Sequence, residues 1–264
     1  MTAKKKWWGD ISFDIDGIKV WTMGERKIAV QRLSKEYLIW NAETHSESTS
    51  PVTLKTLKST QTLTDVPFTR HLFTQTHECM HITPALADRP IVARPASKLN
   101  IPPGEQIEIY VSTPLWFVVK PPSTSYMVAD IPFWRPSDSW FGPSTMEGEL
   151  CYAKYTDAKV SLAKLEKRPT RAITPVLIKN EHDETLTIER INLPAPFLTL
   201  YADTNQQFWT DRIEITHHNE TEKAGLRLTN HPPSQLESDA EIVSIARISS
   251  HGNHFVRSIK SLLG

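Results

Sequence analysis

The sequence predicts an all-β protein, built from antiparallel β-sandwiches, most simply two, with one short helix at the C-terminal end. Along most of the chain, short runs of β-branched and aromatic residues alternate with polar residues, which is the period of strands with one buried face. Prolines and other turn-forming residues separate these runs. Only residues 253–263 carry apolar residues at intervals of three and four, the spacing of a helix face.

The first third of the chain predicts a three-strand meander. Apolar residues alternate over 11–15, return over 18–21 and continue over 28–33. Asp16-Gly17 and Gly24-Glu25 lie between these runs, and such pairs accept the positive φ angles of tight hairpin turns. We therefore expect consecutive antiparallel strands joined at these two turns.

The middle of the chain predicts further strands and the best candidate for a linker. Residues 99–111 contain a Pro-Pro-Gly turn that leads into an alternating strand, and residues 115–119 are apolar on both faces, as in a central strand. Residues 120–125 are rich in proline and serine, which is typical of a linker. This segment divides the chain into domains 1–122 and 123–264, unless the two halves form one intertwined unit.

The second half repeats the strand pattern without an internal sequence repeat. Strands are predicted over residues 150–155, 158–162, 173–179, 186–191, 197–201, 208–210, 213–216, 226–229 and 242–248. The terminal helix is predicted from the spacing of Phe255, Val256, Ile259, Leu262 and Leu263, with Asn253 as its cap.

Composition and charge favour a cytoplasmic protein without a general affinity for nucleic acid. The 30 basic residues balance the 30 acidic ones, so no net charge attracts nucleic acid or anionic lipid. Residues 115–119 form the longest apolar run, far short of the roughly 20 residues of a membrane-spanning helix. Asp10, Asp14 and Asp16 interrupt the place of a signal peptide's apolar region, and two cysteines fit a reducing compartment.

Motifs for nucleotide binding and nucleophilic catalysis are absent from the sequence. Neither GxGxxG nor GxxxxGK[ST] occurs, and GxSxG is also missing. These absences favour a binding protein over an enzyme, with an unknown protein or a small ligand as its partner and no obligatory cofactor.

Several segments resemble an uncharacterised, mainly archaeal prokaryotic family known as domain of unknown function 432. The segments are 137–142 (SDSWFG), 147–153 (EGELCYA), 171–176 (RAITPV), 189–194 (ERINLP) and 208–210 (FWT). The resemblance covers about residues 130–215. It implies a prokaryotic cytosolic protein, and it assigns no activity and no site residues.

The segment His77-Glu-Cys-Met-His81 is a candidate metal site. On a strand, His77, Cys79 and His81 would point to one face. Two imidazoles and a thiolate are suitable ligands for Zn²⁺ or copper. However, HxCxH is not a standard zinc spacing, so histidines on an ordinary strand are the simpler interpretation.

An aromatic cluster between residues 133 and 149 is the leading candidate for a binding surface. Aromatic rings beside carboxylates and a guanidinium can hold a ligand or a peptide partner by stacking and a few polar contacts. The alternative is that the aromatic side chains fill the core between two sheets. A third hypothesis is a carbohydrate-active enzyme that uses Glu147 or Glu149 as an acid or base. The candidate binding residues are Trp134, Arg135, Asp138, Trp140, Phe141, Glu147 and Glu149.

Overall fold

The computed structural model consists almost entirely of β-strands, which confirms the all-β prediction. Among the described residues, the helical segments of more than one residue are two three-residue 3-10 turns, η2 (Leu162–Lys164) and η3 (Ala195–Phe197). No helix in this part of the chain is long and apolar enough to cross a membrane. The structure describes residues 6–44, 49–57, 66–122, 124, 126–134, 136–142, 144, 146, 148–218, 223–236, 240–249, 254–258 and 263.

The chain divides into two units that interleave along the sequence. Unit 1 comprises Met1–Ala85, Leu115–Trp134 and Arg168–Thr170. Unit 2 comprises Leu86–Pro114, Arg135–Lys167 and Arg171–Gly264. The boundary predicted at residue 122 falls inside unit 1, between the neighbouring strands Trp116–Lys120 and Ala129–Pro132 of one sheet.

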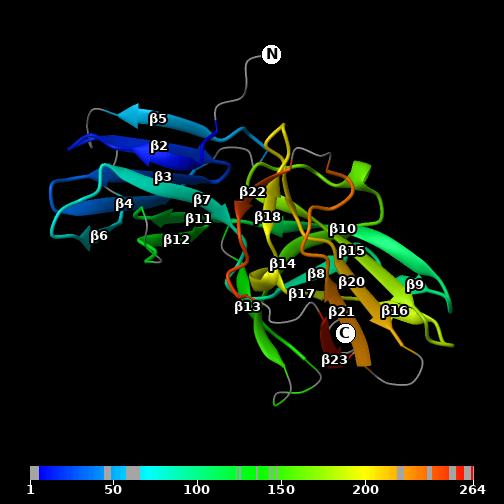
Figure 1. The fold of residues 1–264 in the computed structure, drawn as a ribbon. Coiled ribbons are helices and arrows are strands. Elements are labelled where there is room, and N and C mark those ends of the chain that lie inside the picture. Colours follow the sequence, from blue (N-terminus) through cyan, green and yellow to red (C-terminus); the bar gives the residue numbers. More distant parts are fainter. Residues whose placement is uncertain are drawn as a thin grey trace. The chain divides into compact units, whose positions relative to one another are not determined.

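Unit 1 is a β-sandwich of two antiparallel sheets (Figure 1). One sheet has the order β5-β2-β3-β4-β6, with bounds Thr53–Leu57, Ile18–Met23, Arg26–Arg32, Glu36–Glu43 and Phe68–Leu72. The other has the order β1-β7-β11-β12, with bounds Gly9–Ser12, Cys79–Ala85, Trp116–Lys120 and Ala129–Pro132. Their side chains meet in an aromatic core, where the ring centroids of Trp21 and Phe117 are 5.2 Å apart.

One of the two predicted hairpin turns of unit 1 is confirmed and the other is wrong. Gly24 has φ +55° and joins β2 to β3 in a tight hairpin, and β4 completes a meander. At Asp16-Gly17 the chain turns, since the Gly17 amide donates to the Asp14 carbonyl at 2.9 Å. The strand before this turn, β1, pairs with β7 of the other sheet instead of β2. A turn signal specifies where the chain reverses, but tertiary packing decides which strands pair.

Unit 2 is built around a 12-stranded sheet in which antiparallel pairs predominate (Figure 1). The main path is β17-β8-β14-β10-β15-β19-β18-β22, with bounds Ile191–Leu193, Ile91–Pro95, Glu149–Lys159, Gln106–Pro114, Arg171–Asn180, Phe208–Thr210, Leu200–Ala202 and Glu241–Ser244. The attached strands are β13 (Ser137–Phe141), β20 (Ile213–His217), β21 (Lys223–Leu228) and β23 (His254–Ser258). A separate pair joins β9 (Leu99–Ile101) to β16 (Leu186–Ile188).

The predicted C-terminal helix is wrong over His254–Ser258. These residues form β23, which pairs antiparallel with β21 along its length. Pairing with β21 supplies backbone hydrogen bonds to a five-residue segment that would be only marginally stable as a short isolated helix. Of the other residues on which the prediction rested, Leu263 is described and buried. Asn253, Ile259 and Leu262 lie outside the described residues.

Candidate functional site

The candidate site lies on the β-hairpin formed by β13 and β14 in unit 2. The two strands are antiparallel, with Asp138 opposite Tyr152 and Trp140 opposite Leu150. Because successive side chains of a strand point to opposite faces, these four residues share one face of the hairpin. We call this the outer face, and it consists of Asp138, Trp140, Leu150 and Tyr152.

The opposite face of the hairpin belongs to the core. Phe141 and Cys151 are buried there and pack with Val92 of β8. Burial, reinforced by the charge of Glu149 and opposed by Arg190, raises the pKa of the Cys151 thiol to about 11. Cys151 is therefore a core thiol and not a reactive one.

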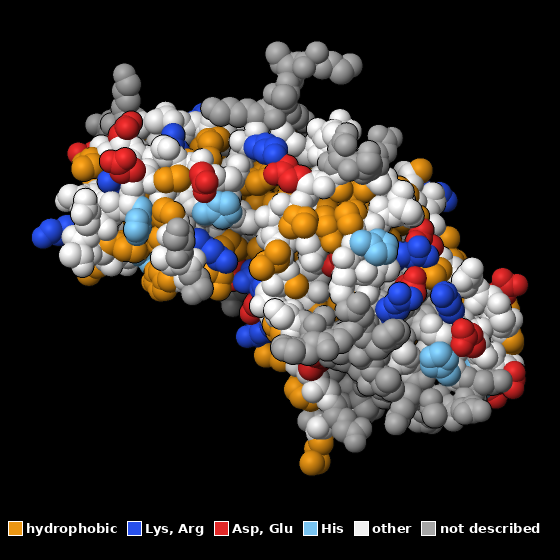
Figure 2. Space-filling model, viewed as in Figure 1, with side chains coloured by type: hydrophobic (Ala, Val, Ile, Leu, Met, Phe, Trp, Pro, Cys, Tyr) orange, Lys and Arg blue, Asp and Glu red, His pale blue; other side chains and the backbone are white. Residues whose placement is uncertain are grey.

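The outer face exposes apolar side chains that are ordinarily buried. Trp140 is 47% exposed, Leu150 is 46% exposed, and Met146 in the connecting loop is 92% exposed. Figure 1 shows the hairpin extending away from the rest of the sheet, and Figure 2 shows hydrophobic side chains at its far end, at the bottom of the view. Trp140 and Leu150 are direct cross-strand neighbours, so they form one exposed apolar pair.

The indole of Trp140 is held in place despite its exposure. Its Nε1 donates a hydrogen bond to the carbonyl of Ser144 at 2.9 Å. The ring also lies directly against Gly148, where an added Cβ would come within 2.6 Å of Nε1. Gly148 is therefore required for this close approach of ring to backbone, and the indole is fixed before any partner binds.

A polar rim borders the apolar pair. The guanidinium of Arg89 lies 3.1 Å from a carboxylate oxygen of Asp138 and 3.8 Å from one of Asp88. It also lies over the ring of Tyr152, 5.4 Å from the centroid, and the Tyr152 hydroxyl donates to Asp88 at 2.9 Å. Burial, followed by the hydrogen bond to Asp88, raises the pKa of Tyr152 to about 12. Of the side chains that the structure describes in this rim, two carboxylates share one guanidinium.

The structure brings only part of the predicted binding set together. Asp138 and Trp140 share the outer face, whereas Phe141 is buried and Glu149 lies on the inner face, accepting a hydrogen bond from Asn192 Nδ2 at 2.7 Å. Trp134 is half-buried and belongs to unit 1. Arg135 and Glu147 lie outside the described residues.

Sequence reasoning missed Leu150, Tyr152, Asp88 and Arg89. The first two alternate with the buried Cys151 in the sequence, and this alternation could have placed them beside Trp140. Arg89 and Asp88 come from the segment before β8, and no local pattern joins them to β14. Their contact with Asp138 and Tyr152 depends on the parallel pairing of β8 with β14.

The residues proposed for a metal site are not brought together. His77 precedes β7, and its carbonyl accepts a hydrogen bond from the Tyr37 hydroxyl. His81 Nδ1 lies 2.8 Å from Asp10 Oδ1, and burial raises the pKa of Cys79. Among the described residues, no group of three or more His, Cys, Asp or Glu side chains is placed to hold a metal ion.

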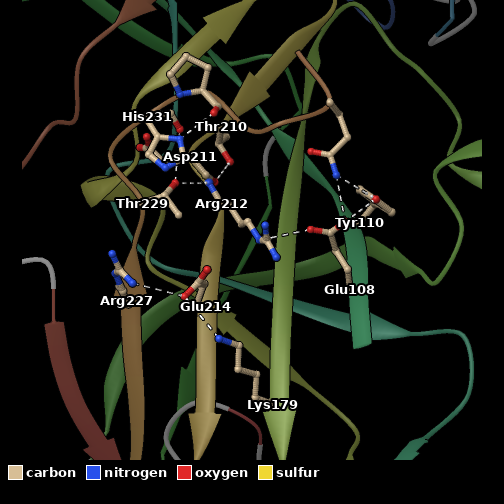
Figure 3. Close-up of polar contacts among 12 residues, drawn as sticks. Glu108, Tyr110, Lys179, Thr210, Asp211, Arg212, Glu214, Arg227, Thr229 and His231 are labelled. Carbon is tan, nitrogen blue, oxygen red and sulfur yellow. Dashed lines mark hydrogen bonds and ion pairs between the residues drawn. The ribbon is translucent and has the colours of Figure 1, made fainter. Parts of the chain in front are cut away.

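A second polar cluster, centred on Asp211, lies in the interior of unit 2 (Figure 3). Asp211 is fully buried, and its carboxylate accepts hydrogen bonds from the Thr199 amide at 2.6 Å and the Tyr201 hydroxyl at 2.9 Å. Burial raises the pKa of Asp211, and the two hydrogen bonds partly offset this rise. The carboxylate joins the chain before β18 to the bend between β19 and β20, which is a structural role.

Beside Asp211, charged side chains from β10, β15, β20, β21 and the bend before β20 form ion pairs (Figure 3). Arg212 Nε lies 3.3 Å from Glu108, which also accepts a hydrogen bond from Tyr110 at 2.6 Å. Glu214 lies 3.9 Å from both Lys179 and Arg227. Each carboxylate here is matched by at least one cation, as expected of a paired sheet face.

The comparisons with known proteins identify a family without assigning an activity. No curated protein and no solved structure matches the chain. A family model matches residues 7–262, well beyond the segments at 130–215 that carry the resemblance noted in the sequence. The match includes both units. The chain therefore belongs to the family described as protein of unknown function DUF432.

Proposed function

We propose that this protein acts by binding a partner through the outer face of the β13–β14 hairpin. The observation that carries this proposal is the exposed pair of Trp140 and Leu150, with Met146 beyond it. Burying the side chains of tryptophan, leucine and methionine in an interface removes apolar surface from water and stabilises the complex. Tryptophan is also enriched among the residues that contribute most to binding energy.

Single exposed apolar residues are common on protein surfaces and need no explanation. This surface differs in three respects. Its two apolar residues are cross-strand neighbours, the indole is fixed by Ser144 and Gly148, and a charged rim borders them at Asp138. An apolar centre with a polar rim is the arrangement of a protein interface. A rigid aromatic side chain also loses little conformational entropy on binding.

Site-specific photocross-linking tests the proposal. A benzophenone amino acid placed at Leu150 in the full chain should form defined adducts in cells, because a bound partner would cover this position. Matched control probes belong at Ile15, an exposed apolar residue of unit 1 (57% exposed), and at Val160 in unit 2 (52% exposed). Equal adduct patterns at all three positions, or none at Leu150, would refute binding at the outer face.

A further inference from the structure

We infer that the partner is an extended peptide segment that adds a strand to β13 and carries an apolar residue two positions from a Lys or Arg. The inference rests on the proposed function and specifies its partner. Among the described residues, β13 pairs only with β14, and no described strand lies along its other edge. Open edges present unpaired backbone groups that extended peptides can recognise.

The backbone pairing identifies which groups face the open edge. The Tyr152 amide donates to the Pro90 carbonyl at 2.8 Å, on the side of β14 away from β13. The opposed residues Asp138 and Tyr152 are therefore a pair without hydrogen bonds between them. Since hydrogen-bonded and non-bonded pairs alternate along an antiparallel ladder, Trp140 and Leu150 are a second such pair. The backbone N–H and C=O groups of Asp138 and Trp140 therefore point away from β14, in the plane of the sheet.

The same two residues carry the exposed side chains of the outer face. A peptide strand bonded to Asp138 and Trp140 would place its residues opposite them on that face, about 4.5–5.5 Å away between Cβ atoms. The residue opposite Trp140 would contact the indole and should be apolar. The residue opposite Asp138, two positions along the peptide, would meet the polar rim.

The charge of the rim selects the second residue. Among the described side chains of this rim, the carboxylates of Asp88 and Asp138 share the guanidinium of Arg89, so two negative charges face one positive charge. The Asp138 side chain is 61% exposed, so it can be reached from the open edge. A Lys or Arg at this peptide position would supply a second positive charge, whereas a Glu would be repelled.

Capped eight-residue peptides test this inference by fluorescence anisotropy with the full chain. The first peptide has Leu-Thr-Lys at its centre and threonine elsewhere, and the second replaces the lysine with glutamate. Two further versions of the first are N-methylated, either at the leucine and lysine amides or at the intervening threonine. We expect about fivefold weaker binding of the glutamate peptide. Binding should be lost when the leucine and lysine amides are methylated, because these amides would donate to β13. Methylation of the threonine amide should change little.

Charge reversal provides the matched protein variants. Asp138→Lys should invert the preference, so that the glutamate peptide binds more tightly than the lysine peptide. Glu105→Lys, at an exposed position of unit 2, makes the same change in net charge and should leave the preference unaltered.

Equal affinity for the lysine and glutamate peptides, equal effects of the two methylation patterns, or no binding of any peptide would overturn the inference. The proposed function would survive these results if cross-linking at Leu150 remained specific. Absence of specific cross-linking at Leu150 would instead refute the proposed function itself.

Discussion

Removing the hydroxyl of Tyr201 tests whether the buried carboxylate of Asp211 depends on its hydrogen bonds. Asp211 is 0% exposed and accepts from the Tyr201 hydroxyl at 2.9 Å. A hydrogen bond to a charged group contributes about 1.5–3 kcal/mol, and water cannot reach this site to replace the donor. We therefore expect Tyr201→Phe to lower the free energy of unfolding by about 1.5–3 kcal/mol at pH 7.

The pH dependence of this loss follows from the pKa of Asp211. Burial raises that pKa above the value in the unfolded chain, so the stability that Asp211 contributes is present below the unfolded pKa and is lost as the pH rises through the folded pKa. Loss of the Tyr201 donor raises the folded pKa further. The deficit of Tyr201→Phe should therefore shrink as the pH falls and Asp211 becomes protonated.

Urea unfolding in a pH series that runs downward from pH 7 measures both effects, because Asp211 gains its proton as the pH falls through its raised pKa. Tyr37→Phe is the matched control, because the buried Tyr37 hydroxyl donates to the neutral carbonyl of His77. Its deficit should be about 0.5–1.5 kcal/mol and independent of pH. A Tyr201→Phe deficit that is below about 0.5 kcal/mol at pH 7, or that does not shrink along the pH series, would refute the role given to Asp211.

Three further predictions concern other parts of the structure. Gly148→Ala should cost about 1–3 kcal/mol by overpacking and should red-shift tryptophan fluorescence, because the new Cβ would displace the Trp140 indole. Burial and two neighbouring histidines lower the pKa of His217, so stability should fall as the pH drops below the unfolded value of about 6.5. His217→Gln should flatten this dependence in pH-dependent thermal unfolding. Iodoacetamide should modify the partly exposed Cys79 faster than the buried Cys151, as read by mass spectrometry.

The strand content could be predicted from the sequence because each strand carries its own pattern. Alternating apolar residues and the glycine at Gly24 specify the β2–β3 hairpin locally, and the structure has it. The pairing of β1 with β7 could not be predicted, because it joins residues about 70 positions apart that share no local signal. The apolar spacing at 255–263 fits both a helix and a short strand, and pairing with β21 favours the strand.

The candidate site was predictable in part. The aromatic and acidic composition of residues 133–149 pointed to Trp140 and Asp138, which the structure places together on one face. The same composition also included Phe141 and Glu149, because composition does not reveal which face a side chain occupies. The contribution of Arg89 depends on a parallel strand pairing that only the folded chain creates.

Binding and stability measured together for Trp140→Ala test the central claim most directly. Truncating a fully buried large aromatic side chain costs about 3–5 kcal/mol. Trp140 is 47% exposed, so we expect a loss of about 2 kcal/mol, roughly half the value for a buried site. Cross-linking from Leu150 should nevertheless disappear under conditions where the variant remains folded. A loss of about 3–5 kcal/mol with unchanged cross-linking would make Trp140 a structural residue and would contradict binding at the outer face.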